Sequence, residues 1–304
     1  MTADYVLTLS CPDRPGVVAA VSGLLAGHGC NITESQQFGD PVANRFFMRV
    51  QFTGDLPLDD LRAAFTALAP EYGMDLQLFD QAVKPRVLVL VSKFDHCLND
   101  LLYRARSGLL DIEIVAVASN HPDLRPLTQS YGIDYHHLPV TPETKPRQEA
   151  EILALVEHYQ ADLVVLARYM QVLSEDLCAK LAGRVINIHH SFLPSFKGAK
   201  PYHQAYARGV KLIGATAHYV THDLDEGPII EQEVARVNHT HSPEDLAAIG
   251  RDVERQALAR AVRWHTEHRV LLDGHKTIVF PRSGAGPTAT FAPRRHGGVG
   301  YGRA

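Results

Sequence analysis

Residues 86–92 read RVLVLVS and residues 161–167 read ADLVVLA, and both are short apolar runs bounded by polar residues. A strand buried on both faces of a parallel sheet has this continuous pattern, whereas a half-exposed strand alternates apolar and polar residues. The segments between them include HCLNDLLYRARSG at 96–108 and ETKPRQEAEILALVEHY at 143–159, which are typical of helices. The alternation of strands and helices predicts a Rossmann-like, mostly parallel, doubly wound α/β domain.

The chain before this domain follows a different pattern, in which short alternating strands are interrupted by two amphipathic helices. The strand-like segments are YVLTLS at 5–10, CNITESQQF at 30–38, FFMRVQF at 46–52 and MDLQLF at 74–79, and the helical segments are DRPGVVAAVSGLLAGHG at 13–29 and the stretch from Leu58 to Leu68. This βαββαβ order predicts a ferredoxin-like domain, with both helices on one face of an antiparallel sheet.

These patterns divide the chain into four parts. We place the ferredoxin-like domain at residues 1–82, a linker at 83–85 and the Rossmann-like domain at 86–281. The last part, 282–304, is rich in Gly, Pro and Arg and has no acidic residue, so we expect a disordered tail.

Composition excludes several classes of protein. The net charge is −4, whereas nucleic-acid-binding proteins usually carry an excess of basic residues, which argues against a nucleic-acid partner. Four cysteines without a CxxC pair indicate neither a disulfide framework nor a zinc ribbon. The N-terminus has no basic start, and no segment has the ~20 apolar residues of a bilayer span. We therefore expect a cytoplasmic protein without a membrane partner.

The residues suited to chemistry follow one buried strand and one turn. In RVINIHH at 184–190, alternation along a strand puts Asn187 and His189 on one side and predicts that His190 faces away as a structural residue. In GATAHYVTHDLDEGPIIEQ at 214–232, a strand, a turn and a strand bring in a carboxylate. An amide, an imidazole and a carboxylate suit attack on an acyl carbon, because the amide stabilises an oxyanion while the other two move protons.

A metal site is the alternative use of these histidines. His218 and His222 have the i, i+4 spacing of a helical metal site, but they fall in a strand and a turn, and no cysteine pair assists. We therefore predict no metal site.

Three motifs of the second domain resemble the folate-dependent formyltransferase family over about residues 85–280. They are N-I-H at 187–189, S-F-L-P-S-F at 191–196 and D-E-G-P-I-I at 225–230. The resemblance implies that Asn187, His189 and Asp225 are catalytic and that His218 supports them by hydrogen bonding to Asp225. It also places Met170, Gln171, Val172 and Leu173, in the loop LARYMQVL at 166–173, beside the pterin of a folate substrate.

One departure from the family pattern concerns the acyl acceptor. Members that accept a ribonucleotide have a glycine-rich turn after the first strand of this domain, where this chain has VSKFDHCLNDLL at 91–102. Without glycines the backbone cannot readily wrap a phosphate, which makes water the expected acceptor. This departure, the second histidine at His190 and the N-terminal domain together resemble the formyltetrahydrofolate deformylases over nearly the whole chain.

That resemblance implies hydrolysis of 10-formyltetrahydrofolate to formate and tetrahydrofolate without a cofactor. The reaction would balance the one-carbon pool and supply formate for purine biosynthesis. Two alternatives stay open at this point. One is a formyltransferase to an amine acceptor such as glycinamide ribonucleotide, and the other is a non-catalytic amino-acid-sensing protein.

The N-terminal domain itself resembles an ACT domain through DRPGVVA at 13–19 and CNI at 30–32. The resemblance implies a small amino-acid effector, for which glycine and methionine are our candidates, and pairing of domains in a homo-oligomer. The residues expected to bind it are Asp13, Gly16, Val17, Asn31 and Ile32. The segment from Asp13 to Gly16 equally suits an ordinary strand-to-helix turn.

Overall fold

The computed structural model describes residues 2–191 and 201–282. The tail predicted to be disordered, from residue 283 on, and most of the S-F-L-P-S-F motif lie outside the described residues. In the part of the chain that is described, no helix is both long enough and apolar enough to cross a bilayer.

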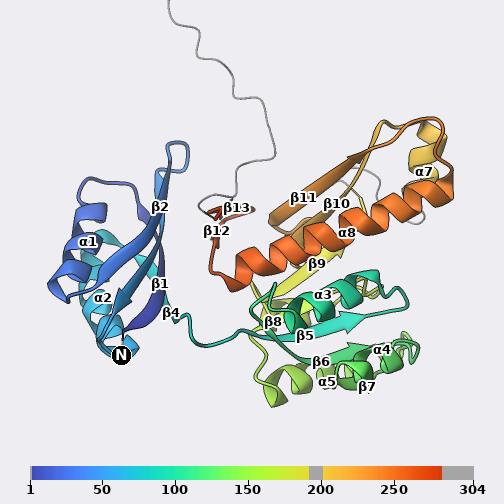
Figure 1. Cartoon of the computed structure of the whole chain (residues 1–304), viewed down its shortest axis with the longest axis horizontal. Coiled ribbons are helices and arrows are strands. Elements are labelled where there is room, and N and C mark those ends of the chain that lie inside the picture. Colours follow the sequence, from blue (N-terminus) through green and yellow to red (C-terminus); the bar gives the residue numbers. More distant parts are fainter. Residues whose placement is uncertain (1, 192–200, 283–304) are drawn as a thin grey trace, which may run out of the picture.

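The N-terminal domain has the predicted βαββαβ order. Its elements are β1 (Ala3–Pro12), α1 (Val17–Gly27), β2 (Asn31–Asp40), β3 (Arg45–Gly54), α2 (Leu58–Tyr72) and β4 (Asp75–Asp80). The sheet has the order β2-β3-β1-β4 with antiparallel neighbours, and both helices cover the face turned away from the second domain (Figure 1). The apolar sides of the helices, such as Val21 and Phe65, complete a core with the alternating residues of β1 and β3. The predicted ferredoxin-like arrangement is therefore confirmed.

The second domain is built on a seven-stranded sheet with the order β11-β10-β9-β8-β5-β6-β7. The strands β7, β6, β5, β8 and β9 are parallel, and β10 and β11 complete one edge in antiparallel orientation. The elements are β5 (Arg86–Val91), α3 (His96–Arg106), β6 (Glu113–Ser119), α4 (Arg125–Ser130), β7 (Asp134–His137), α5 (Lys145–His158), β8 (Leu163–Leu166), α6 (Glu175–Lys180), β9 (Val185–His189), α7 (Pro201–Arg208), β10 (Leu212–Tyr219), β11 (Ile229–Arg236), α8 (Pro243–Thr266), β12 (Val270–Asp273) and β13 (Lys276–Val279). The prediction of a mostly parallel, doubly wound sheet is confirmed.

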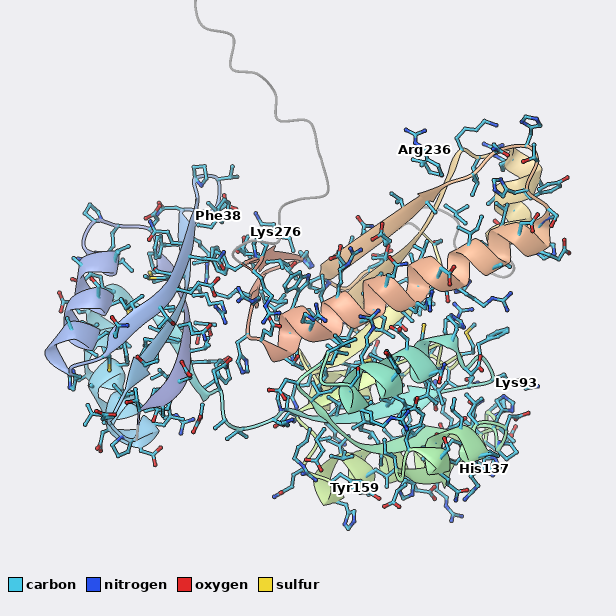
Figure 2. The ribbon with its side chains drawn as sticks, in the orientation of Figure 1. Phe38, Lys93, His137, Tyr159, Arg236 and Lys276 are labelled. Atoms are coloured by element: carbon cyan, nitrogen blue, oxygen red, sulfur yellow. The ribbon has the colours of Figure 1, made fainter. Side chains whose placement is uncertain are left out.

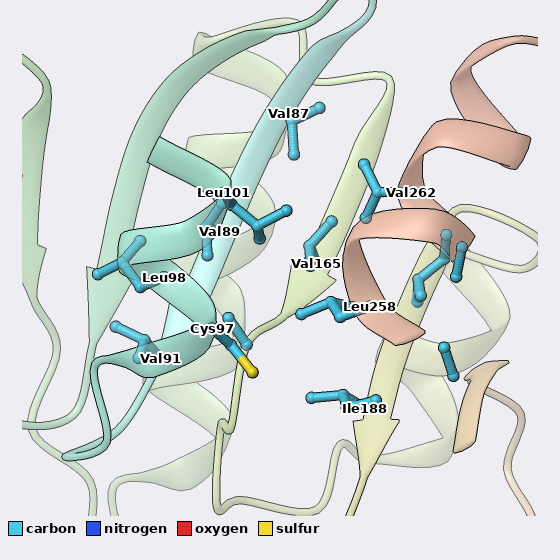
Figure 3. Close-up of a cluster of buried hydrophobic side chains, with 14 of the residues drawn as sticks. Val87, Val89, Val91, Cys97, Leu98, Leu101, Val165, Ile188, Leu258 and Val262 are labelled. Atoms are coloured by element: carbon cyan, nitrogen blue, oxygen red, sulfur yellow. The ribbon is translucent and has the colours of Figure 1, made fainter. Parts of the chain in front are cut away.

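The central strand β5 explains why its sequence is apolar without interruption. Val87 and Val89 point into a core formed with α3 and α8, to which Leu98 and Leu258 contribute (Figure 3). Leu88, one residue along, points to the opposite face, where α5 supplies the cover. Because both faces are covered, every position from 87 to 91 is apolar.

The long helix α8 links the far end of the sheet with the N-terminal domain (Figure 1). It begins with a capping box, in which the Ser242 side chain accepts from the Asp245 backbone N–H and the Asp245 carboxylate accepts from the Ser242 N–H. At its other end, Arg49 of β3 donates to the carbonyls of Glu267 and His268. The N-terminal domain therefore caps the carboxyl end of this helix.

The hairpin β12–β13 also joins the two domains. Leu271 of this hairpin and Phe280, which directly follows it, form a small apolar cluster with Phe47 of the N-terminal sheet. Lys276 forms an ion pair with Asp40 at the end of β2, so the hairpin lies against this strand (Figure 2).

Candidate active site

A cavity of about 250 Å³ lies beyond the carboxyl ends of β8 and β9. This is where open α/β sheets bind ligands. All residues of the predicted folate loop, 170–173, line this cavity, and so do all predicted catalytic residues, Asn187, His189, His218 and Asp225. Residues that are far apart in the sequence thus meet at one place, and Met170 and Val172 expose about half of their surface there (53% and 54%).

The pairing of β9 with β10 sets the first contact of the site. His218 lies directly opposite Asn187 in the antiparallel register. His218 Nδ1 donates to the carbonyl of Tyr219 at 2.8 Å, which leaves Nε2 of the neutral ring as the acceptor for the Asn187 amide N–H at 3.3 Å. Burial lowers the pKa of His218 and so favours this neutral form. The imidazole therefore fixes the orientation of the Asn187 amide.

The contact between His189 and Asp225 makes the second half of the site. His189 Nδ1 lies 3.2 Å from Asp225 Oδ2, within hydrogen-bonding distance, whereas His218 Nε2 lies 3.8 Å from Asp225 Oδ1. The predicted hydrogen bond from His218 to Asp225 is thus not formed, because His218 uses Nε2 for Asn187. The carboxylate is positioned by His189 instead.

The ionisation of Asp225 suits a proton acceptor. Burial alone would raise the pKa of this carboxyl, but the hydrogen bond from His189 and the electrostatic attraction of the same ring outweigh it, and the pKa is lowered. Asp225 is therefore a carboxylate at neutral pH, and it lines the cavity with a largely buried side chain.

The turn that carries Asp225 depends on Gly227, which the sequence analysis did not single out. Asp225 itself adopts a left-handed conformation with φ of 57°. A Cβ atom at position 227 would lie 1.8 Å from the carbonyl oxygen of Tyr219, so only glycine lets the turn cross β10 this closely. Pro228 then accepts a backbone hydrogen bond from Tyr219 at 2.9 Å. The Gly-Pro pair after Asp225-Glu226 was the signal available in the sequence.

The prediction for His190 is wrong. Alternation holds only inside a strand, and β9 ends at His189, so His190 is free to turn back. The two rings stack with centroids 5.1 Å apart, and both line the cavity. Burial and the nearby charge of Arg168 lower the pKa of His190 to about 4, so it is neutral at the cavity wall.

A buried polar cluster next to the cavity was also missed. Glu254 of α8 is 1% exposed and accepts from His96 Nε2 at 2.7 Å and from the Tyr202 hydroxyl at 2.5 Å. Arg168, which lines the cavity, places Nε 3.3 Å from the same carboxylate. Glu254 follows Val253 on the apolar side of α8, and a charged residue at such a position was the signal in the sequence.

Within residues 2–191 and 201–282, one group of side chains has the spacing of metal ligands. It consists of His96, Cys97 and Glu254, whose ligand atoms lie within 4.8 Å of one another. The Glu254 carboxylate already accepts from His96 and Tyr202 and forms an ion pair with Arg168, and burial raises the pKa of Cys97 well above its usual value, so the sulfur stays a thiol. These groups suit a hydrogen-bonded network better than a cation.

Comparisons with known proteins agree with both domains. The family model for formyl transferase matches residues 85–262, and the ACT domain model matches residues 5–69. A formyltetrahydrofolate deformylase from Corynebacterium sp. (strain P-1) is 57% identical over 279 residues, which cover 91% of this chain and 98% of that protein. The chain belongs to the formyltetrahydrofolate deformylase family.

Comparison with solved structures shows how much of the fold this chain shares with its relatives. The crystal structure of a formyltetrahydrofolate deformylase from Burkholderia mallei matches with a TM-score of 0.89 and 55% identity, covering 92% of this chain and 100% of that one. A glycinamide ribonucleotide transformylase from Symbiobacterium toebii matches at 30% identity with a TM-score of 0.62 and covers only 67% of this chain. The deformylase family therefore shares both domains with this chain, which confirms the resemblance found in the sequence.

The residues predicted to bind an effector do not come together within one chain. Asp13 and Gly16 lie before α1, and Asn31 and Ile32 lie after it, so the length of this helix, about 16 Å, separates the two pairs. Val17 is 2% exposed and belongs to the domain core. Asp13 instead lies against Gly39 of β2.

Proposed function

We propose that the chain hydrolyses 10-formyltetrahydrofolate to formate and tetrahydrofolate, balancing the one-carbon pool and supplying formate for purine biosynthesis. The observation that carries this proposal is the meeting of Asn187, His189 and Asp225 in one cavity with the 170–173 loop. Family membership names the substrate, and the cavity supplies the groups that acyl hydrolysis needs.

The attack step follows from the three side chains. The water oxygen bonds to the formyl carbon while Asp225 takes one proton from it, which the lowered pKa of this carboxyl makes feasible at neutral pH. The carbonyl electrons move to oxygen, and the oxyanion is held by the Asn187 amide and by Nε2–H of His189 as an imidazolium. Because His189 Nδ1 is engaged by Asp225, its Nε2 faces away from the carboxylate.

The collapse step returns the proton. The bond between the formyl carbon and N10 breaks with its electron pair going to N10, which takes the proton held by Asp225. Formic acid leaves as formate and releases its proton to solvent. The balance is one water consumed and one tetrahydrofolate, one formate and one proton formed, so the proposed reaction needs no cofactor.

The surface exposed by the folate loop supports the placement of the substrate. Met170 and Val172 are half exposed although they are apolar, and they lie on the rim of the cavity. Exposed apolar side chains beside convergent polar groups are typical of ligand sites. We place the pterin against residues 170–173, with the formyl group directed at Asn187.

The acyl acceptor is tested by measuring formate. Purified protein incubated with 10-formyltetrahydrofolate is expected to release stoichiometric formate and tetrahydrofolate without any amine, and added glycinamide ribonucleotide is expected to leave both yields unchanged. Formyl transfer to the ribonucleotide would establish the transferase alternative. Turnover of neither kind, with amino-acid binding intact, would establish a non-catalytic sensor.

The N-terminal domain suggests regulation by an amino acid, for which we propose glycine or methionine. The two predicted half-sites lie at opposite ends of α1, so we propose that they meet across two copies of the chain in a homo-oligomer. The edge strand β2 is mostly exposed and is available for such pairing. Light scattering should show an oligomer, and calorimetry with each amino acid should show binding that Asn31→Ala weakens.

We also propose that the protein works in a reducing compartment such as the cytoplasm. All four cysteines, Cys11, Cys30, Cys97 and Cys178, are free. Buried thiols that are not paired persist where glutathione keeps them reduced. Thiol titration of the protein from cells should count four free groups.

A further inference from the structure

Two of the side chains that line the catalytic cavity are buried and have nitrogen atoms without a hydrogen-bond partner among the described residues. They are His189, through Nε2, and Arg168, through Nε and Nη1. The residues are 7% and 9% exposed. Buried polar atoms are nearly always satisfied in native proteins, so an unpartnered set at one cavity indicates a ligand or solvent that completes it.

The charge of Arg168 is only partly balanced. Its Nε lies 3.3 Å from Glu254 Oε2, but this ion pair has no hydrogen-bonding geometry, and the carboxylate already accepts from His96 and Tyr202. The neighbouring ring of His190 is neutral, since its pKa is lowered to about 4. The Arg168 guanidinium therefore lies beside an uncharged ring at the cavity.

The backbone of Arg168 is held in an uncommon conformation. Its φ is 62°, in the left-handed region that side chains other than glycine, asparagine and aspartate rarely occupy. The conformation is supported by neighbouring strands, because the Arg168 carbonyl accepts from the Ser92 backbone and the next-but-one residue, Met170, donates to the Ser92 hydroxyl. Strain of this kind is retained where surrounding structure enforces it, often at ligand sites.

We infer that Arg168, together with His189 Nε2, forms a subsite for a small monocarboxylate anion, which the product formate occupies after the C–N bond breaks. The inference rests on the proposed function. One formate oxygen is the former formyl oxygen and stays on His189. The other oxygen comes from the attacking water and is received by the guanidinium, whose planar fork matches a carboxylate.

The subsite gives Arg168 a role in the reaction that is distinct from bond cleavage. The negative charge of the product forms only after attack and collapse, so a fixed cation at this position stabilises the product side and separates formate from N10. A neutral formyl group gains little from the same contact. Arg168 is thus expected to affect formate affinity more than folate affinity.

The test measures formate binding directly on folate-free protein, using sodium [13C]formate and NMR line broadening, with sodium acetate and sodium chloride as matched salts. The variants are Arg168→Met, Arg168→Lys and the double variant Arg168→Met/Glu254→Gln, which removes the buried ion pair as a unit and so does not leave Glu254 uncompensated. Arg147→Met, at a surface arginine that is 84% exposed, is the control. Thermal melts identify the variants that fold.

Wild type and Arg147→Met are expected to bind formate more tightly than acetate or chloride. Both Met variants should lose roughly tenfold or more in formate affinity, the weakening that follows loss of a charge-assisted hydrogen bond, and Arg168→Lys should fall between. A folded double variant with wild-type formate affinity overturns the subsite, as does wild type that prefers formate over neither salt. Formate binding that depends on Arg168 in a protein that releases no formate would refute the proposed function and leave the subsite standing.

Discussion

Two clusters of buried charged and polar side chains stand in contrast. At the domain interface, Glu34 Oε2 accepts from Arg49 at 2.6 Å and from Arg269 at 2.9 Å, and Glu267 pairs with Arg269 at 2.8 Å. No buried side-chain atom of this interdomain cluster lacks a hydrogen-bond partner in residues 2–191 and 201–282. At the catalytic cavity, by contrast, His189 and Arg168 keep unpartnered nitrogens.

The difference teaches what each cluster is for. A fully satisfied network lowers the energy of one arrangement and locks two domains together. A network with open donors is incomplete by itself, and in the reaction we propose it is completed by the substrate, the oxyanion or the product. Substitutions in the interdomain cluster should therefore cost stability, and substitutions in the catalytic cluster should cost rate.

The largest effect is expected for Asp225→Asn. The amide keeps the shape of the carboxylate but cannot accept the proton of water, so kcat should fall by about 10²- to 10⁴-fold while folate affinity is retained. Formate release under saturating substrate measures it. Asp223→Asn, in the same turn with a 60% exposed side chain, is the matched control and should keep near-normal turnover. Normal turnover in Asp225→Asn would remove this residue from the mechanism.

The next effect is expected for Arg49→Met in the interdomain cluster. Breaking a buried pair leaves Glu34 and two helix carbonyls with fewer donors, so the free energy of unfolding should fall by about 3–5 kcal/mol. Urea unfolding measures this, and kcat per folded molecule should be unchanged. Arg62→Met, at a surface ion pair, should change little. A loss of kcat without a loss of stability would break the contrast between the clusters.

A smaller loss is expected for Gly227→Ala. The added methyl would lie 1.8 Å from the Tyr219 oxygen, so the turn must move and displace the Asp225 carboxylate. Displacement on the order of 1 Å costs about 100-fold in rate. Steady-state kinetics per folded molecule should show this loss, and the melting temperature should fall as well because the clashing atom belongs to the backbone. The control is Gly23→Ala, because a Cβ there meets nothing within 4 Å. A wild-type rate in Gly227→Ala would show that the conformation of the turn does not position the Asp225 carboxylate.

The smallest effect is in the pH dependence of stability. Burial lowers the pKa of His268, which stacks on Phe79 between the domains, from 6.5 to about 3. Below pH 6.5 the unfolded chain therefore binds a proton at His268 that the folded chain does not bind. The contribution of His268 to the free energy of unfolding is complete above pH 6.5 and is lost as the pH falls toward 3. His268→Asn, which tolerates the φ of 53°, should reduce the slope of the free energy of unfolding against pH by about 1.4 kcal/mol per pH unit, measured by urea unfolding at several pH values. An unchanged slope would show that His268 does not contribute to the pH dependence of stability.

Local patterns predicted the elements of both domains well. The continuous apolar run of β5 indicated burial on both faces, as the two cores on either side of the sheet show. Strand alternation put Asn187 and His189 on one side and the acid-rich turn brought in a carboxylate, which the family resemblance identified as Asp225. The cavity brings the three side chains together. Their chemical roles stay predictions until the variants are measured.

Local patterns failed where a contact depends on distant segments. His190 turns back toward the cavity because β9 ends one residue earlier, and strand length is set by pairing with β8 and β10. Glu254 and Arg168 meet only because α8 covers the sheet beside the end of β8. Gly227 is required by the carbonyl of Tyr219, which belongs to another strand.

The sequence by itself determined the order of strands and helices, the two domains and the residue types available for acyl chemistry. These follow from side-chain periodicity and turn preferences, which act over a few residues. Tertiary structure alone decided that His218 orients Asn187 rather than Asp225, and that Arg168 reaches the cavity with open donors. Hydrogen-bond partners and burial depend on distances between segments far apart in the chain, and only the folded arrangement sets these distances.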